Sequence, residues 1–308
     1  MISDLLGIIE SNGDRGAIVP FSRIEDLRND LIELKNNKFH SNWLDRMINW
    51  VANDANNFIP SDIKFKHHSL ISIIMPSPKV ILKFEYNGKI LDCILPPHYF
   101  NWELNNDRVL HYLSEYLRPF GYSITKIITL PQKMLAVHCG LALYGRNNIC
   151  YNNELGSFMQ IMTYISDFPC NEDNWFPLKR MELCDKCNIC INSCPTNIIE
   201  KNRRLINSDR CLTLINESSE DFPEWIDKKF HNSIIGCIKC QEDCPGNIQN
   251  KDNVKKGMLF TEDETREFLT HKKGDTYSNS LEYKLKSIGT LQEFIEVMPR
   301  NLKALIKE

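Results

Sequence analysis

The sequence contains no long apolar run. It also has no strong excess of charge of one sign, because its 308 residues carry a formal net charge of -3 at pH 7. No stretch approaches the roughly 20 apolar residues that span a bilayer. The first residues, Met1 to Leu6, lack the basic region and the small-residue cleavage site of a signal peptide. The charge gives no global basic field for nucleic acid. These absences predict a cytoplasmic protein that does not associate with membranes.

Cysteine is the residue in excess. The chain has 12 cysteines, and eight of them lie between Cys184 and Cys244. In a small secreted chain this number would indicate disulfides, but here there is no export signal and the spacing is typical of metal ligands. Thiolates bound to metal in a reducing compartment are therefore expected.

The first cysteine run has the spacing of bacterial ferredoxins, Cys-x2-Cys-x2-Cys-x3-Cys-Pro. In that pattern three thiolates hold one [4Fe–4S] cube and the fourth cysteine ligates the other cube. The second run, Cys-x2-Cys-x3-Cys-Pro, has Ile234 where its first cysteine would stand, and Cys211 can supply the missing thiolate. Two clusters are predicted, cluster 1 with the ligands Cys184, Cys187, Cys190 and Cys244, and cluster 2 with the ligands Cys194, Cys211, Cys237 and Cys240.

Zinc is the alternative for these cysteines, since two Cys-x2-Cys pairs can form a zinc ribbon. Zinc does not account for three cysteines at successive x2 spacing, nor for the Cys-Pro pair that closes both runs. Four cysteines remain. Cys93 and Cys139 are expected to be small buried apolar residues, on a strand and a helix, whereas Cys150 and Cys170 lie in expected loops and stay unassigned.

The first 170 residues mix helical and strand patterns. Helices are expected over 22–37, 107–117, 131–144 and 156–166, and strands over 69–75, 79–86 and 89–95. Asn87-Gly88 predicts a tight hairpin, because both positions of such a turn need positive φ. Beyond the cysteines, Thr261 to Glu264 form a capping-box signature, and Pro299 is expected to break a last helix over 291–306.

The chain is therefore expected to hold three parts. An α/β or α+β domain over 1–170 would bind the substrate and any further cofactor. A bacterial-ferredoxin-like module over 171–250 would hold both clusters. A short helical tail would occupy 251–308.

Four segments resemble the epoxyqueuosine reductases. Leu135 to Asn148 is similar to that family's Ala-Gly-Leu-Gly-Trp-x-Gly-Lys-Asn segment, and the stretch from Gly156 to Asp167 is similar to its next element. Arg210-Cys-Leu-Thr213 resembles Arg-Arg-Cys-Ile-Ser, and 235–247 resembles Tyr-Gly-Cys-x2-Cys-Gln-x2-Cys-Pro-Trp-Asn. Order and spacing match from about residue 135 to 247, over a third of the chain.

The resemblance implies a nitroreductase-like α/β domain that holds cobalamin base-off and a two-cluster module that passes electrons to cobalt. It implies a substrate that is the epoxide of a modified nucleoside in tRNA, and reductive dehalogenases share the corrinoid and cluster plan. By position, Arg146, Cys150 and Thr213 fall where the family contacts cobalamin. No Gly-x-Gly-x-x-Gly follows a strand, so a dinucleotide is unsupported and a separate ferredoxin or flavodoxin is the expected electron donor.

The proton donor is where this chain departs most from the family. The family's proton-donating Asp heads an Asp-Ser-Ala-Pro segment and falls at Lys126 here, and a lysine donates near neutral pH only if burial lowers its pKa. The other candidates are His138, Tyr144 and Tyr151, each with packing as the alternative role. The family's Cys-Pro-Trp-Asn is Cys-Pro-Gly-Asn at 244–247.

Three functions follow from these observations. The leading hypothesis is an enzyme that passes electrons from the clusters to cobalamin and on to a substrate, because a plain electron carrier needs no large domain ahead of its clusters. The second is an electron-transfer protein that lacks its own corrinoid and reduces a partner protein. The third is a true tRNA epoxyqueuosine reductase whose proton donor has been relocated.

Overall fold

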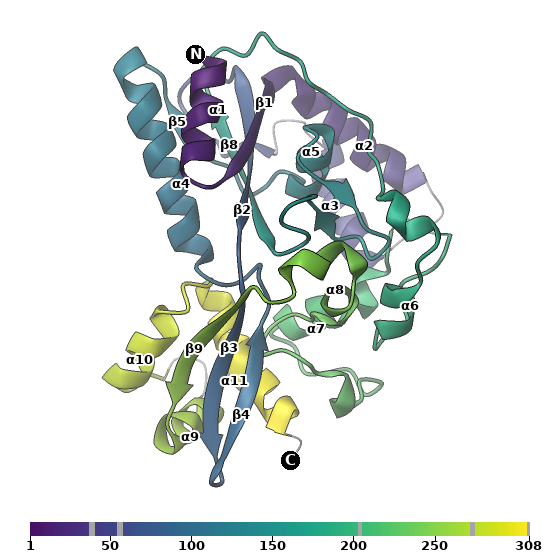
Figure 1. Ribbon diagram of the computed structural model, residues 1–308, viewed down its shortest axis with the longest axis vertical. Helices are drawn as coiled ribbons and strands as arrows, with labels where there is room; N and C mark the ends of the chain where they lie inside the picture. The colour runs from purple at the N-terminus through teal and green to yellow at the C-terminus, as the bar shows by residue number, and fades with distance from the viewer. Residues whose placement is uncertain (37–40, 54–57, 203–204, 272–274, 307–308) are drawn as a thin grey trace.

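An antiparallel four-stranded sheet organises the N-terminal half of the protein. The computed structural model describes residues 1–36, 41–53, 58–202, 205–271 and 275–306 (Figure 1). The sheet has the strand order β1-β2-β8-β5, with the bounds Arg15–Pro20, Ser69–Pro76, Met159–Ser166 and Ile124–Lys126. Every residue of β2 except Pro76 is buried. A strand without alternation of this kind is typical of a sheet covered on both faces.

Helices cover both faces of this sheet (Figure 1). One face carries α1 (Ile2–Ser11) and α4 (Trp102–Leu117), whose apolar residues pack on β2 and β8 in one core. The other face carries α2 (Ile24–Asn36), α3 (Asn42–Asn53) and α5 (Gln132–His138), which build a second core. A short 3₁₀ helix precedes α2 at Phe21–Arg23, and another follows α4 at Arg118–Phe120. The result is a three-layer helix–sheet–helix arrangement.

A second sheet joins a hairpin from the first third of the chain to a strand that follows the cysteine-rich region. Its order is β4-β3-β9, with the bounds Lys89–Leu95, Lys79–Tyr86 and Val254–Phe260, and β9 runs parallel to β3. The hairpin turns at Asn87 and Gly88, whose φ values of 50° and 70° are those the sequence predicts. The helices α9 (Glu262–Thr270), α10 (Asn279–Lys286) and α11 (Gln292–Ile306) pack against this sheet, where the rings of Phe84 and Phe260 stack at 4.5 Å.

The cysteine-rich region consists of short elements between the two sheets. A small two-stranded ribbon, β6 (Leu143–Tyr144) and β7 (Cys150–Tyr151), precedes β8, and its Tyr144 forms a bridge with Arg180 just ahead of the first cysteine run. Its helical pieces are η4 (Glu182–Asp185), α6 (Ile189–Ser193), η5 (Ser208–Arg210), α7 (Leu212–Glu217), η6 (Lys228–Phe230), α8 (Lys239–Glu242) and η7 (Pro245–Asn250). Because these pieces are short, they depend on contacts with the rest of the fold rather than on their own helical stability.

A buried polar network ties the end of the cysteine region to the start of β8. The Ser157 N–H donates to Asn247 Oδ1 at 2.7 Å, and the Ser157 hydroxyl donates to Gln241 Oε1 at 2.8 Å. Asn247 Nδ2 donates to the Gln241 carbonyl at 2.8 Å, and Asn247 is fully buried. Gly156 has φ +56°, and a Cβ there would lie 2.2 Å from Asn247 Oδ1. A glycine is therefore required where the two regions meet.

Several expectations from the sequence are wrong. The stretch 156–166 is not helical, because Met159–Ser166 forms the buried strand β8, and periodicity cannot separate a short buried strand from a buried helix. The helix expected over 131–144 ends at His138, because Gly140 adopts φ +74° just beyond it. Pro299 lies inside a continuous α11, whose buried residues offset the lost backbone hydrogen bond.

Other expectations agree with the structure. The mixed α/β class is confirmed, and the capping box at Thr261 and Glu264 is complete in both directions. The segment after residue 250 contains a strand, β9, that the sequence pattern does not predict, in addition to the expected helices. No helix in the described part of the chain is long and apolar enough to cross a membrane.

Candidate iron–sulfur site and adjoining cavity

The eight cysteines of the two runs lie in two separate groups. One cavity is lined by Cys184, Cys187, Cys190 and Cys244, and a second by Cys194, Cys211, Cys237 and Cys240. Each cavity is lined by one of the two predicted ligand sets and by no cysteine of the other. Within the described ranges, no three His, Cys, Asp or Glu side chains converge as the ligands of a single ion would.

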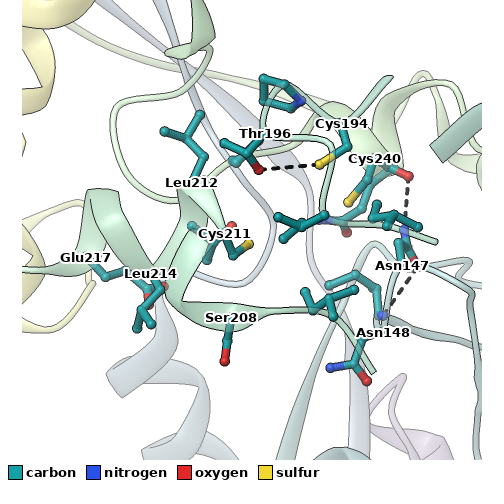
Figure 2. A pocket seen from close by; sticks show the side chains of 18 of the residues that line it. Asn147, Asn148, Cys194, Thr196, Ser208, Cys211, Leu212, Leu214, Glu217 and Cys240 are labelled. Carbon is teal, nitrogen blue, oxygen red and sulfur yellow. Dashed lines mark hydrogen bonds between the residues drawn. The ribbon is translucent and has the colours of Figure 1, made fainter. Parts of the chain in front are cut away.

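The first group is bordered by the apolar side chains of Met181, Leu183 and Ile189. Burial and then the neighbouring thiols of this group raise the pKa of Cys190 to about 11. The second group is the wall of a cavity of about 300 Å³, and Figure 2 shows Cys194, Cys211 and Cys240 around it. Burial, followed by the three other thiols, raises the pKa of Cys240 well above its ordinary value. Such thiols become thiolates when a metal is bound, so both donor sets fit iron–sulfur clusters.

Asn147 connects the two groups. Its Nδ2 donates to the Tyr151 hydroxyl at 2.9 Å. It also donates to the Cys240 carbonyl at 3.0 Å (Figure 2). Tyr151 interacts in turn with Cys244, whose pKa the Tyr151 hydroxyl lowers against the larger opposing effect of burial. One short chain of side chains therefore runs from a cysteine of the first group to a cysteine of the second.

Hydrogen bonds also reach individual sulfur atoms. The Arg146 N–H donates to Cys184 Sγ at 3.4 Å, and Asn232 Nδ2 donates to Cys237 Sγ at 3.2 Å. Hydrogen bonds to ligand sulfur are among the features that set the potential of an iron–sulfur cluster.

Arg146 faces the first cysteine group rather than a ligand cavity. Its side chain donates to the carbonyls of Lys201, at 2.5 Å, and of Cys184, and the residue is buried. No carboxylate among the described residues pairs with it. The sequence expectation grouped Arg146 with Cys150 and Thr213, but the structure does not bring these three together.

An outer cavity of about 370 Å³ adjoins the cavity of the second cysteine group. Both cavities are lined by six residues, His98, Tyr99, Lys133, Ile149, Thr213 and Glu217. Cys150 and Thr213 line the outer cavity, so two of the three residues expected to contact cobalamin face it. Cys150 lies in β7 rather than in the expected loop, and burial raises its pKa to about 12.

The four expected proton donors all lie elsewhere. Lys126 is at the exposed end of β5, with its Nζ 3.9 Å from Asp107. Both ring nitrogens of His138 have partners, Asp30 Oδ2 and the Phe176 carbonyl, each at 2.6 Å. Tyr144 is part of an apolar core, and Tyr151 lines the cavity of the first cysteine group. None of the four lines the outer cavity.

Glu217 and Tyr99 line the outer cavity instead. The Tyr99 hydroxyl donates to Glu217 Oε1 at 2.5 Å. Burial raises the pKa of Glu217, and burial followed by the nearby Glu217 carboxylate raises that of Tyr99. Burial lowers the pKa of His98 on the same wall. A sequence signal did exist, since Thr213 and Glu217 stand four residues apart after Cys211 and so share one face of a helix.

Comparisons with known proteins agree with this site. Residues 183–247 match the model of a 4Fe-4S double cluster binding domain. Epoxyqueuosine reductase from Cyclobacterium marinum is 31% identical over 129 residues, 42% of this chain and 40% of that protein. The enzyme of the same name from Staphylococcus aureus is 30% identical over 118 residues, 38% of this chain and 30% of that protein. The chain thus aligns with well under half the length of these relatives.

Solved structures extend the likeness to the whole fold. A structure of epoxyqueuosine reductase from Bacillus subtilis superposes with a TM-score of 0.68 at 16% identity, covering 99% of this chain and 80% of that one. A crystal structure of epoxyqueuosine reductase with an epoxyqueuosine-modified tRNA-Tyr stem loop gives the same TM-score at 17% identity, with the same coverage.

The fold and the two cysteine groups define a double-cluster iron–sulfur protein. Its motifs are similar to those of the epoxyqueuosine reductases, and its fold matches theirs, so the resemblance drawn from its sequence is confirmed as a similarity.

Proposed function

We propose that the protein is an iron–sulfur oxidoreductase that reduces a substrate in the outer cavity. Cluster 1 would be held by Cys184, Cys187, Cys190 and Cys244, and cluster 2 by Cys194, Cys211, Cys237 and Cys240. The observation that carries the proposal is the shared wall between the second cysteine group and the outer cavity. Cluster 2 would therefore be adjacent to a substrate or cofactor bound in the outer cavity and could transfer electrons to it.

Electrons would enter at cluster 1. Leu183 and Ile189 border the first cysteine group and are 46% and 37% exposed, so this group lies near the surface. A one-electron donor of the ferredoxin or flavodoxin class would reduce cluster 1, and cluster 2 would pass the electrons inward. The Asn147 and Tyr151 side chains would hold the two clusters in a fixed relation.

Cobalamin is the proposed further cofactor, and the residues fit it in part. Cys150 and Thr213 would contact it in the outer cavity, whereas Arg146 would not. When bound base-off, the corrinoid would supply a strongly nucleophilic reduced cobalt. The chain's own residues would orient the substrate, exclude water and supply protons.

The ligand assignment is tested by counting iron after anaerobic purification. The two-cube arrangement requires about eight iron and eight sulfide per chain. Cys211→Ser should lose about half of the iron, because cluster 2 would lose one of its four ligands. Cys170→Ser is the matched control, because Cys170 lies outside both groups, and it should keep the full content. Equal iron in both variants would refute the assignment.

The corrinoid is tested by titration with cob(II)alamin while EPR spectra are recorded. Conversion of the cobalt signal to the base-off form, with stoichiometric binding, supports the enzyme. A signal that stays base-on would leave an electron-transfer protein that reduces a partner. The orientation of Arg146 toward the first cysteine group favours this second candidate, because one of the three corrinoid contacts is missing.

A third candidate is the reduction of epoxyqueuosine in tRNA. One structural relative was crystallised with an epoxyqueuosine-modified tRNA stem loop. The carboxyl group of Glu217 in the outer cavity favours this candidate. It offers an acid in a chain that has Lys126 at the position of the family's proton-donating Asp. Anaerobic incubation of the reduced protein with such a stem loop, followed by nucleoside analysis, tests it. Unchanged epoxyqueuosine would exclude this substrate.

A further inference from the structure

Glu217 stands apart among the residues of the two cavities. Among the described residues that line them, it is the only one with a carboxyl group. Oε1 accepts the hydrogen bond from Tyr99, so the second carboxyl oxygen, Oε2, is left to carry a proton. Figure 2 shows Glu217 and Leu214 on the same helix, α7. This helix begins directly after Cys211.

The fold holds this side chain in place. The α7 helix is short, but Arg300 donates to the Ile215 carbonyl at 2.9 Å and Asn301 donates to the Asn216 carbonyl at 2.9 Å. Both donors come from α11, and Asn216 itself donates to the Gly236 carbonyl at 2.7 Å. The last turn of α7 is therefore fixed between the C-terminal helix and the loop that carries the second cysteine run.

Tyr99 is held equally firmly. It lies just after β4, and its ring meets that of Phe294 edge-on at 5.3 Å. Gly236 leaves the space for its hydroxyl, since a Cβ at that glycine would lie 2.2 Å from Tyr99 Oη. The pair of Tyr99 and Glu217 thus joins three parts of the chain that are far apart in sequence.

The charges around Glu217 are consistent with a carboxyl group that keeps its proton. Burial raises its pKa, the hydrogen bond from Tyr99 lowers it, Glu293 raises it and Lys133 lowers it, with a net rise. Burial keeps the pKa of His98 low, so that neighbour is neutral at pH 7. The guanidinium of Arg300 interacts with the backbone end of α7 rather than with the carboxyl group.

We propose that Glu217 is the acid that protonates the substrate as it is reduced in the outer cavity, with Tyr99 as the residue that positions its carboxyl group. This inference rests on the proposed function and adds to it the source of the proton. It places the acid on the helix that follows a cluster ligand, in a different part of the chain from Lys126.

The chemistry balances for an epoxide. Two electrons arrive singly through the clusters from a reduced ferredoxin or flavodoxin. Both carbon–oxygen bonds break, a carbon–carbon double bond forms, and the oxygen leaves as water after taking up two protons. Glu217 gives one proton to the departing oxygen and regains one from solvent, and the second proton comes from solvent.

The first measurement needs no substrate. Infrared spectra of the holoprotein at pH 7 should contain the C=O band of a protonated carboxylic acid, which shifts in D₂O. Glu217→Gln should lack this band. Tyr99→Phe should move it to higher frequency, because the carbonyl loses its hydrogen bond. Glu220→Gln is the matched control, since it changes an exposed glutamate three residues away, and should leave the band unchanged. A wild-type spectrum without such a band would overturn the proposal.

The second measurement is single-turnover conversion of the epoxyqueuosine-modified stem loop as a function of pH. The wild-type rate should fall as pH rises through the pKa of Glu217. Glu217→Gln should be slower by about 10²- to 10⁴-fold and should lose that limb. In Tyr99→Phe the limb should move to higher pH, because the hydrogen bond that lowers the pKa is gone. A Glu217→Gln protein with the wild-type profile would overturn the proposal.

The two measurements separate this inference from the proposed function. If the wild type does not convert the stem loop, the proposed substrate fails, and the infrared band decides whether Glu217 holds the proton. If the stem loop is converted but the band survives in Glu217→Gln, the reductase stands and the acid is another residue.

Discussion

Replacing Arg146 with glutamine should make the reduction potential of cluster 1 more negative. The guanidinium is buried, reaches the Cys184 carbonyl and is paired with no carboxylate among the described residues. Adding an electron makes the cluster more negative, and a nearby fixed positive charge stabilises that state. Removing the charge should therefore disfavour reduction.

The size of the effect follows from Coulomb's law. At an effective dielectric constant of about 20, two unit charges about 8 Å apart interact by roughly 2 kcal/mol. For a one-electron couple this corresponds to roughly 85 mV, since about 59 mV is a factor of ten. Arg146 lines the cavity of the first cysteine group but not that of the second, so the shift of cluster 2 should be smaller.

The assay is an anaerobic redox titration followed by EPR, with iron content measured for every variant. Arg146→Lys is the matched control, because it keeps the charge and should stay near the wild-type potential. If Arg146→Gln keeps both clusters and the potential of cluster 1 does not move, the charge does not tune that cluster. A larger shift in cluster 2 than in cluster 1 would equally refute the reasoning.

Three further predictions concern single side chains. Asn232→Leu removes the hydrogen bond to Cys237 Sγ, so the potential of cluster 2 should become more negative by tens of millivolts, roughly the scale of a bond of about 1 kcal/mol, in the same titration. Gly236→Ala forces a side chain into φ +61° and against Tyr99, so the free energy of unfolding should fall by about 2 kcal/mol or more in a denaturant titration. Burial alone would raise the pKa of Glu264, but its lysine partner on α10 and its other hydrogen bonds lower it from 4.5 to about 2. The stability from this group is therefore complete above pH 4.5 and lost as pH falls toward 2, and Glu264→Gln should flatten that part of the stability curve.

Features of the fold that depend on adjacent residues could be predicted from the sequence. The hairpin at Asn87-Gly88 and the capping box at Thr261 depend on a few adjacent residues, and both are present as expected. The sequence predicts a helix over 156–166, but Met159–Ser166 is a strand. Its residues are buried between two layers of helices, so its pattern of apolar residues does not distinguish a strand from a helix. The sequence pattern does not predict strand β9, because its partner β3 lies far away in the sequence. A pairing between distant segments is not visible in the local sequence of either strand.

In the candidate site too, some features could be predicted from the local sequence and others depend on contacts between distant parts of the chain. Cysteine spacing is a local property, because a short loop that wraps a cube must present its thiolates at fixed intervals. The sequence alone therefore indicated two iron–sulfur clusters and a similarity to the epoxyqueuosine reductases. Which way Arg146 points and which acid enters the outer cavity depend on where α7, α11 and the end of β4 meet. Only the tertiary structure decided these points, because the side chains that meet there come from distant parts of the chain and nothing in their spacing along it records the contact.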